Sequence, residues 1–291
     1  MYEIYNDSLN YSGNNTTLIR LSKLLNLRFT NIIKNNIIGI HAYKFGKKVI
    51  NKNINFIIII GGTDINIDVY NASKLTIIRK CLEQAKFIIA FNKYIYNRLL
   101  YFNINISKIK IIKQSVPILN PVKFYNLRNK FNIRTKKIFL LVGNIRPVKD
   151  VYFLKNIFDN FNMTLIIIGN IINGNYNFGK NIIHLDGLES NYIYDCMKQV
   201  DGLINTSKSE GMSIAILEAM KLKCPVYARN NEGNKSIIKH LYNGFIFENS
   251  FEFYKYSEYN VTKIIDNAYK YVSNIHNTDI EKLKYYKILI R

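Results

Sequence analysis

The chain has 291 residues, 48% of them hydrophobic, and a formal net charge of +21 at pH 7. This length and apolar content suffice for one large or two compact domains with a buried core, so a disordered protein is excluded. The charge would suit nucleic acid or an anionic membrane. However, the favoured residues Asn, Ile, Lys and Tyr have A/T-rich codons, so much of the lysine excess indicates a base-skewed genome.

Short apolar runs alternate with longer amphipathic stretches along the chain, which is typical of a parallel sheet covered on both faces. The predicted strands are Asn36–Ile40, Asn55–Ile60, Phe87–Phe91, Lys108–Lys113, Lys137–Gly143, Thr164–Gly169, Asn181–Leu185, Gly202–Asn205, Pro225–Ala228 and Gly244–Phe247. The predicted helices are Thr16–Leu27, Ser73–Ala85, Val151–Phe158, Tyr192–Gln199, Ile214–Leu222, Lys235–His240, Tyr256–Tyr271 and Asp279–Ile290. The fold class is therefore α/β.

A proline-containing region divides the predicted elements into two groups. Pro117–Arg134 holds two of the four prolines and lies between the strands that end near Lys113 and begin near Lys137. We therefore predict two α/β halves with a cleft between them. The predicted boundaries are an N-terminal domain over residues 1–120, a linker over 121–135, a C-terminal domain over 136–255, and C-terminal helices over 256–291 that can pack back on the N-terminal domain.

The positive charge lies mainly in the first half. Residues 1–135 contain 21 Lys and Arg against 5 Asp and Glu, whereas residues 136–291 contain 20 against 15. Two interpretations are open. These lysines either form an ordinary solvated surface or attract an anionic acceptor or lipid surface. A nucleic-acid binder is not expected, because no recognisable platform of aromatic and basic residues is present.

Targeting and redox signals are few. Cys81, Cys196 and Cys224 lie far apart and form no CxxC pair, so neither a disulfide framework nor a zinc site is expected. The start of the chain has no charged segment followed by an apolar one, and the longest apolar run, Phe56–Ile60, is too short to span a membrane. We expect a soluble, cytoplasmic protein.

Four turns rich in Gly or polar residues follow predicted strands or precede helices. They are Gly13–Thr16, Gly61–Asp64, Val142–Asp150 and Asn205–Ser213. The carboxyl ends of parallel strands share one edge of a sheet, and ligands bind there at the point where strand order reverses. These turns therefore predict the edge of the sheet at which a ligand binds.

The last two turns suggest a phosphate site. Arg146 and Lys149 follow a buried strand, and a guanidinium with an ammonium on one loop suits a diphosphate. Gly211-Met212-Ser213 opens the helix Ile214–Leu222, whose free N–H groups attract an anion. Taken alone, the two basic residues are equally well explained as an ordinary solvated loop.

The segment S-E-G-M-S-I-A-I-L-E-A-M places Glu210 just before this helix and Glu218 within it. A carboxylate at Glu218 can accept two ribose hydroxyls, and Glu210 would face the reacting end of the ligand. On spacing alone, the pair is more often a helix-flanking acid and a surface acid. Gly61-Gly62 is likewise more often a turn than a phosphate cradle. We interpret His41 and His184 as structural histidines.

Four segments together resemble one enzyme family. E-G-M-S-I-A-I-L-E-A-M resembles the E-x7-E motif of the retaining glycosyltransferases of family 4, which have the GT-B architecture of two facing Rossmann-like domains. V-G-N-I-R-P-V-K-D resembles that family's VGR…PxKG loop. The pattern is most similar to the compact branch called glycosyltransferase 1 domain-containing proteins, whose GGTDxN segment and SGN turn match Gly61–Asn66 and Ser12–Asn14. The resemblance is strong over residues 138–248 and patchy before residue 60.

The resemblance implies a hexosyltransferase-like enzyme that moves a sugar from a nucleotide-diphosphate sugar to a glycan, lipid or protein acceptor. It implies no cofactor and no metal, and the chain contains no D-x-D motif. By this resemblance Arg146 and Lys149 bind the diphosphate and assist catalysis, Glu218 binds the ribose, and Glu210 lies beside the donor sugar as a catalytic residue. The remaining donor-binding residues are Gly211, Met212, Ser213, Gly13 and Gly62.

The chain departs from the family pattern at three places. Asn144 stands where such loops usually have arginine, with Arg146 two residues further on. The family histidine before the G-T-D segment is replaced by glycine, at Gly61 or Gly62, and the first half is short. The missing histidine leaves a second hypothesis open, namely a catalytically weak nucleotide-sugar-binding or scaffold protein of the same fold.

Overall fold

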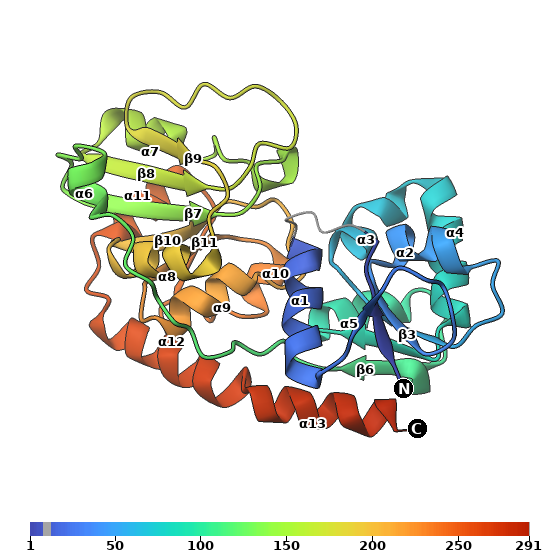
Figure 1. Cartoon of the computed structure of the whole chain (residues 1–291). Coiled ribbons are helices and arrows are strands. Elements are labelled where there is room, and N and C mark those ends of the chain that lie inside the picture. The colour runs from blue at the N-terminus through green and yellow to red at the C-terminus, as the bar shows by residue number, and fades with distance from the viewer. Residues whose placement is uncertain (8–12, 291) are drawn as a thin grey trace. The chain divides into compact units, whose positions relative to one another are not determined.

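The computed structural model describes residues 1–7 and 13–290 and divides them into two compact units. The first unit contains residues 1–7, 13–115, 210–212 and 278–290, and the second contains 116–209 and 213–277. Each unit is built on a parallel sheet flanked by helices (Figure 1). The predicted α/β class is therefore confirmed.

The sheet of the first unit has the strand order β2-β1-β3-β4-β5-β6 in the described residues. The strands are β1 (Glu3–Tyr5), β2 (Phe29–Thr30), β3 (Ile37–Ile40), β4 (Phe56–Ile59), β5 (Phe87–Ala90) and β6 (Ile109–Ile111). All neighbours are parallel, and the register pairs Ile37 with Phe56 and Ile40 with Ile59. Because β2 and β3 flank β1 on opposite sides, strand order reverses between β1 and β3.

Helices cover both faces of this sheet. They are α1 (Gly13–Leu25), α2 (Ala42–Val49), α3 (Thr63–Asn66), α4 (Ala72–Gln84), α5 (Lys93–Leu100) and α13 (Thr278–Leu289), with short 3₁₀ turns η1 (Asp68–Tyr70) and η2 (Ile106–Lys108). Asn71 and Asn92 begin α4 and α5, where their side-chain oxygens accept the N–H groups of Lys74 and Ile95. Such caps satisfy helix donors that have no partner within the helix.

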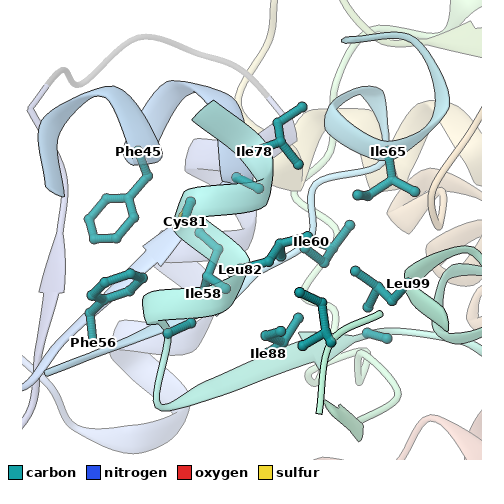
Figure 2. Close-up of a cluster of buried hydrophobic side chains, with 14 of the residues drawn as sticks. Phe45, Phe56, Ile58, Ile60, Ile65, Ile78, Cys81, Leu82, Ile88 and Leu99 are labelled. Atoms are coloured by element: carbon teal, nitrogen blue, oxygen red, sulfur yellow. The ribbon is translucent and has the colours of Figure 1, made fainter. Parts of the chain in front are cut away.

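The strand β4 is wholly apolar because its alternate residues face two different buried clusters. Phe56, Ile58 and Ile60 pack in one core cluster with side chains of α2 and α4, including Cys81 (Figure 2). Ile57 and Ile59 point to the opposite face, into a second cluster with residues of α1 and α13. Successive side chains of a strand face opposite ways, so a strand covered on both faces must be apolar throughout.

The sheet of the second unit has the order β12-β11-β10-β7-β8-β9 in the described residues. Its strands are β7 (Lys137–Val142), β8 (Met163–Ile168), β9 (Ile182–Leu185), β10 (Gly202–Asn205), β11 (Val226–Arg229) and β12 (Phe245–Phe247), again all parallel. The chain proceeds from β7 to β9 in one direction and then returns to place β10 on the other side of β7. Strand order therefore reverses between β7 and β10.

The helices of the second unit are α6 (Leu127–Lys130), α7 (Lys155–Asn160), α8 (Ser190–Lys198), α9 (Ile214–Lys221), α10 (Glu232–Lys235), α11 (Ser250–Ser257) and α12 (Thr262–Ile275), with the 3₁₀ turn η3 (Pro147–Lys149). An aromatic core holds the sheet to α7 and α11, with Phe139 edge-on to Phe158, Tyr227 and Phe253. Aromatic pairs favour such edge-to-face contacts. Among the helices that the structure describes, none combines the length and apolar character needed to cross a membrane.

Each of the ten predicted strands has a counterpart, but three helix predictions are wrong in part. Residues 151–154 form turns before α7, so the helix predicted over Val151–Phe158 starts later. The stretch Tyr256–Tyr271 is interrupted between α11 and α12.

The helix predicted over Lys235–His240 is also wrong, because the helix there, α10, ends at Lys235. Asn243 explains the difference. Its buried side chain accepts the N–H of Lys239 at 2.7 Å and donates to the carbonyl of Ile237 at 3.2 Å, which takes up backbone groups that a helix would use.

Candidate functional site

The loop that follows β7 carries the two basic residues predicted to bind a diphosphate. Gly143 leaves the strand at φ 139°, a conformation that favours glycine. A Cβ atom built on Gly143 would lie 3.6 Å from Cε and 3.8 Å from Nζ of Lys149, so the lysine side chain folds back over the end of the strand. Arg146 immediately precedes η3, and Lys149 ends it.

Arg146 presents a donor that the described residues do not satisfy. Its Nε atom is buried and lacks a hydrogen-bond partner in the part of the chain that the structure describes. An unpaired buried donor on a charged group is costly. An anion bound at this loop would supply the missing acceptor.

The loop after β10 is hydrogen-bonded to the loop after β7. The Thr206 hydroxyl donates to the carbonyl of Lys149 at 2.7 Å, and the N–H of Lys208 donates to the carbonyl of Val148 at 2.8 Å. At the end of β11, Nη1 of Arg229 lies 2.7 Å from a carboxylate oxygen of Asp150, the residue that follows Lys149. This ion pair connects the loop after β7 to β11. The loops that follow β7 and β10, the two strands between which strand order reverses, are therefore hydrogen-bonded to each other.

Buried polar side chains shape the start of α9. Asn205 accepts the N–H of Ser207 at 3.1 Å and donates to the hydroxyl of Ser213 at 3.4 Å. Asn234 donates to the carbonyl of Arg229 at 2.9 Å. Within the described chain, Ser213 makes no capping hydrogen bond to α9, so the helix start retains donors suited to an anion.

Glu218 lies within α9, as predicted, and it is half-buried. The Tyr194 hydroxyl on α8 donates to Oε1 of Glu218 at 2.9 Å. Burial, together with the negative charge of Glu218, raises the pKa of Tyr194, so this phenol remains a hydrogen-bond donor. Sequence reasoning missed Tyr194, which nothing distinguishes from the other tyrosines of this chain.

Most of the remaining residues predicted to bind the donor lie in the turn before α9. Glu210, Gly211 and Met212 occupy the turn between β10 and α9, each partly exposed, and Ser213 after them is buried. Gly13 is the first residue of α1, so the turn predicted over Gly13–Thr16 is wrong and these residues form the first helical turn. Among the described residues, a Cβ atom on Gly13 would meet no atom within 4 Å. The preceding Ser12, included in the predicted turn, is outside the described residues.

Gly62 belongs to a turn built around a buried carboxylate. Asp64 is fully buried and accepts the N–H groups of Gly61 at 3.0 Å, Gly62 at 2.8 Å and Ala42 at 2.8 Å. These bonds join the end of β4 to the start of α2. A carboxylate with several N–H donors is well satisfied without any ligand, so Asp64 has a structural role in the G-G-T-D segment.

His41 lies beside Gly61, one of the two glycines at which the family histidine was expected. A Cβ atom on Gly61 would lie 3.5 Å from Cδ2 of His41 and 3.0 Å from Oδ1 of Asn14. The buried imidazole has Nε2 3.0 Å from the Thr63 hydroxyl, and its Nδ1 accepts the N–H of Lys44 at 3.4 Å. Both ring nitrogens of His41 are thus engaged within the fold.

The cysteine thiols and the metal-ligating side chains of the described residues form no further candidate site. Burial raises the pKa of the Cys196 and Cys224 thiols to about 12, and that of Cys81 further, so these thiols are not activated nucleophiles. Across residues 1–7 and 13–290, no three His, Cys, Asp or Glu side chains gather in a way that could hold a metal ion.

Comparisons with known proteins bear on the family and the fold of this chain. Residues 124–271 match the family model described as glycosyl transferases group 1. Glycosyltransferase 1 domain-containing protein 1 of Xenopus tropicalis is 34% identical over 281 residues, covering 86% of this chain and 80% of that protein. The fold is similar to that of Anabaena Alr3699/HepE in complex with UDP-glucose, with a TM-score of 0.79, 15% identity, and coverage of 99% and 98% of the two chains.

A second solved structure extends the fold comparison. WaaG, a glycosyltransferase involved in lipopolysaccharide biosynthesis, gives a TM-score of 0.71 at 11% identity, with 99% of each chain covered. At these identities the likeness concerns the fold. It confirms the predicted GT-B class of two Rossmann-like parallel-sheet domains.

Proposed function

The chain belongs to the family of group 1 glycosyl transferases and is a glycosyltransferase, and from this premise we propose its donor, stereochemistry and site residues. The donor is a nucleotide-diphosphate sugar, and UDP serves as its first probe because the structural neighbour HepE was solved in complex with UDP-glucose. The acceptor is a hydroxyl group of a glycan, lipid or protein. Transfer retains the configuration of the anomeric carbon and needs no metal ion.

One observation carries the donor assignment. Arg146 and Lys149 share a loop that is hydrogen-bonded through Thr206 to the segment leading into α9, at the reversal of strand order between β7 and β10. Parallel sheets bind ligands at this position. The unpaired Nε of Arg146, the Lys149 ammonium and the start of α9 supply the positive charge that a diphosphate requires.

The proposed chemistry follows from where charge develops. The bond between the anomeric carbon and the diphosphate oxygen breaks as the acceptor oxygen bonds to that carbon, and the sugar acquires oxocarbenium character. The acceptor's proton passes to the leaving diphosphate. Arg146, Lys149 and the N–H groups of α9 stabilise the negative charge on that leaving group, which is the main catalytic contribution.

The two glutamates serve different parts of the donor. Glu218, oriented by Tyr194, accepts hydrogen bonds from the ribose hydroxyls. Glu210, in the turn before α9, lies beside the donor sugar with the backbone of Gly211, Met212 and Ser213. Gly13 and Gly62, in the first unit, are further donor-binding positions in this proposal.

The test measures release of free nucleoside diphosphate from a panel of nucleotide sugars. We expect release by the wild-type chain, its loss in Lys149→Ala and Glu210→Ala, and no effect of a metal chelator. Lys223→Ala is the matched control, since Lys223 is an exposed lysine paired with Asp266. The anomeric configuration of the product, read by NMR, decides retention against inversion.

Binding of a nucleotide sugar without turnover would overturn the enzymatic proposal in favour of the scaffold hypothesis. Family membership does not favour that hypothesis. The thermal shift produced by each nucleotide sugar measures donor binding independently of transfer, because a ligand that binds only the native state raises the melting temperature.

The basic first half supports a proposal about where the acceptor lies. With 21 Lys and Arg against 5 Asp and Glu in residues 1–135, this half would be attracted to an anionic lipid surface. We expect the chain to sediment with phosphatidylserine vesicles at low salt and to be released at high salt. Equal sedimentation with uncharged phosphatidylcholine vesicles would argue against an electrostatic contact.

A further inference from the structure

A groove of about 740 Å³ opens on the second unit, apart from the loops that follow β7 and β10. Its walls are the turn over residues 235–243, the edge strand β12, and side chains of α11 and α12. It shares no residue with the proposed donor site. Its volume is in the range of roughly 300–1,000 Å³ usual for small-molecule sites.

The charges of this groove are balanced, unlike those of the chain as a whole. Two lysines, Lys235 and Lys239, and two glutamates, Glu248 and Glu252, line it, whereas the chain has 41 Lys and Arg against 20 Asp and Glu. Lys235 is paired with Glu232 at 2.5 Å, and the Lys239 ammonium lies 5.3 Å from the centre of the Tyr242 ring. The groove therefore offers no excess charge to select an anion.

Aromatic rings and three isoleucine side chains supply the apolar surface of the groove. Tyr242 is about half exposed, and Tyr256 lies edge-on to the His240 ring with their centres 4.9 Å apart. The flat face of a tyrosine is apolar, while its hydroxyl remains a polar handle. Such surfaces suit the C–H faces of a sugar ring.

Hydrogen-bonding groups lie among these rings. His240 accepts the N–H of Ile246 on Nδ1 at 3.0 Å, so in the neutral ring the proton is on Nε2, which is a donor. Asn230 donates to Glu248, while its own Oδ1 is buried and lacks a partner among the described residues. A buried acceptor without a partner is costly. A hydroxyl-bearing ligand would satisfy it.

We propose that this groove binds a neutral oligosaccharide, with a sugar ring against the exposed Tyr242 and hydroxyls bonded to Asn230, Glu252 and Nε2 of His240. Balanced charge excludes selection of a phosphate or a sulfated chain, whereas aromatic faces with carboxylate, amide and imidazole groups match a polyhydroxylated ligand. The groove would hold a glycan at a place separate from the donor site.

The test uses the full chain labelled with ¹⁵N at its four histidines. Maltohexaose, cellohexaose and chitohexaose are titrated in turn, with inorganic phosphate and dextran sulfate as charged probes. We expect one or more neutral probes to shift the His240 ring signals saturably and to leave those of His184, on β9, unchanged. Tyr242→Ala should weaken that binding roughly tenfold, the loss expected for one aromatic contact.

Two results would overturn the proposal. One is the absence of any His240 shift across the neutral panel, and the other is a shift that Tyr242→Ala does not weaken or that the charged probes reproduce. Donor binding is followed in parallel by the thermal shift with UDP-sugars, which Tyr242→Ala should not change. If the chain binds the donor but no oligosaccharide, only the proposal of an oligosaccharide site in the groove is refuted. If it binds an oligosaccharide but releases no nucleotide, only the proposed transfer reaction is refuted.

Discussion

Arg20 on α1 and Glu281 on α13 form a two-bond ion pair although 261 positions separate them in the chain. The Nη1–Oε2 distance is 2.5 Å and the Nη2–Oε1 distance is 2.8 Å. The Glu281 side chain is fully buried and also accepts the N–H of Ser115 at 2.8 Å. This pair fixes the C-terminal helix on the first unit, where α13 packs beside α1 (Figure 1).

Replacing Glu281 by Ala should destabilise the first unit strongly. The substitution leaves the buried Arg20 guanidinium without its carboxylate, which costs about 3–5 kcal/mol for pairs of this kind. Urea unfolding followed by circular dichroism measures the loss. The double variant Arg20→Met, Glu281→Leu should recover much of it, because no buried charge is then left unpaired.

The matched control for this prediction is Asp266→Ala, which breaks the exposed pair of Lys223 and Asp266. Exposed pairs contribute about 0–1 kcal/mol, so this variant should unfold near the wild-type midpoint. If both variants cost the same free energy of unfolding, the Arg20–Glu281 pair does not anchor α13 as inferred.

His41 should make the first unit sensitive to mild acid. Burial is the main cause that lowers the pKa of His41 from 6.5, with Lys44 acting in the same direction and Asp64 and Asp68 opposing it. As pH falls below about 6.5, the unfolded chain binds a proton that the native imidazole does not, so the free energy of unfolding decreases. The stability is present above that pH and is lost below it.

Urea unfolding of wild type and His41→Asn between neutral pH and pH 5 tests this titration. The variant should be less stable at neutral pH, because it loses the contact with Thr63, but its stability should depend less on pH over this range. Identical slopes for the two proteins would show that another group controls the acid sensitivity.

Tyr194→Phe should weaken donor binding without unfolding the second unit. The change removes the hydrogen bond that orients Glu218, and one such bond to a charged group contributes roughly 1.5–3 kcal/mol. We expect UDP affinity to fall about tenfold or more, with little difference between the two proteins for UDP that lacks both ribose hydroxyls. Calorimetric titration measures both.

Tyr192→Phe provides the control on the same helix. Tyr192 packs against Phe124, and removing its hydroxyl should leave UDP affinity unchanged. An equal loss in both variants would indicate a general disturbance of α8, and the assignment of Glu218 to the ribose would lose its support.

The strands were predictable because burial on both faces demands apolar residues at every position. Phe56–Ile60 carries this signal, and β4 occupies Phe56–Ile59. The two-residue strand β2, Phe29–Thr30, lies at the sheet edge and is too short to carry any pattern. Helix α2 was missed as well, since the residue that caps its start, His41, has φ 75°, a conformation that the sequence does not indicate.

The candidate site was predictable only where its residues are close together in sequence. The loop with Arg146 and Lys149 and the segment from Glu210 to Glu218 are short motifs that can be recognised directly. The hydrogen bond from Thr206 to Lys149 joins residues 57 positions apart, and the one from Tyr194 to Glu218 joins two helices. These contacts depend on packing between elements, which no local pattern specifies.

Gly169, which follows β8, should tolerate no side chain. Its φ is 154°, and a Cβ atom there would lie 2.3 Å from the carbonyl oxygen of Gly143, the residue that begins the loop proposed to bind a diphosphate. Because this neighbour is backbone, it cannot move aside without shifting the loop that carries Arg146 and Lys149. Gly169→Ala should therefore cost about 2 kcal/mol or more in the free energy of unfolding and also lower UDP affinity.

Gly13→Ala is the control for the free energy of unfolding, since a Cβ atom at that position would lie within 4 Å of none of the described residues. Its cost should stay within about 0.5 kcal/mol. Urea unfolding and calorimetric titration with UDP are measured on each variant. A Gly169→Ala chain with wild-type stability and wild-type UDP affinity would show that the loop after β7 moves freely, and a rigid, preorganised diphosphate corner would then be ruled out.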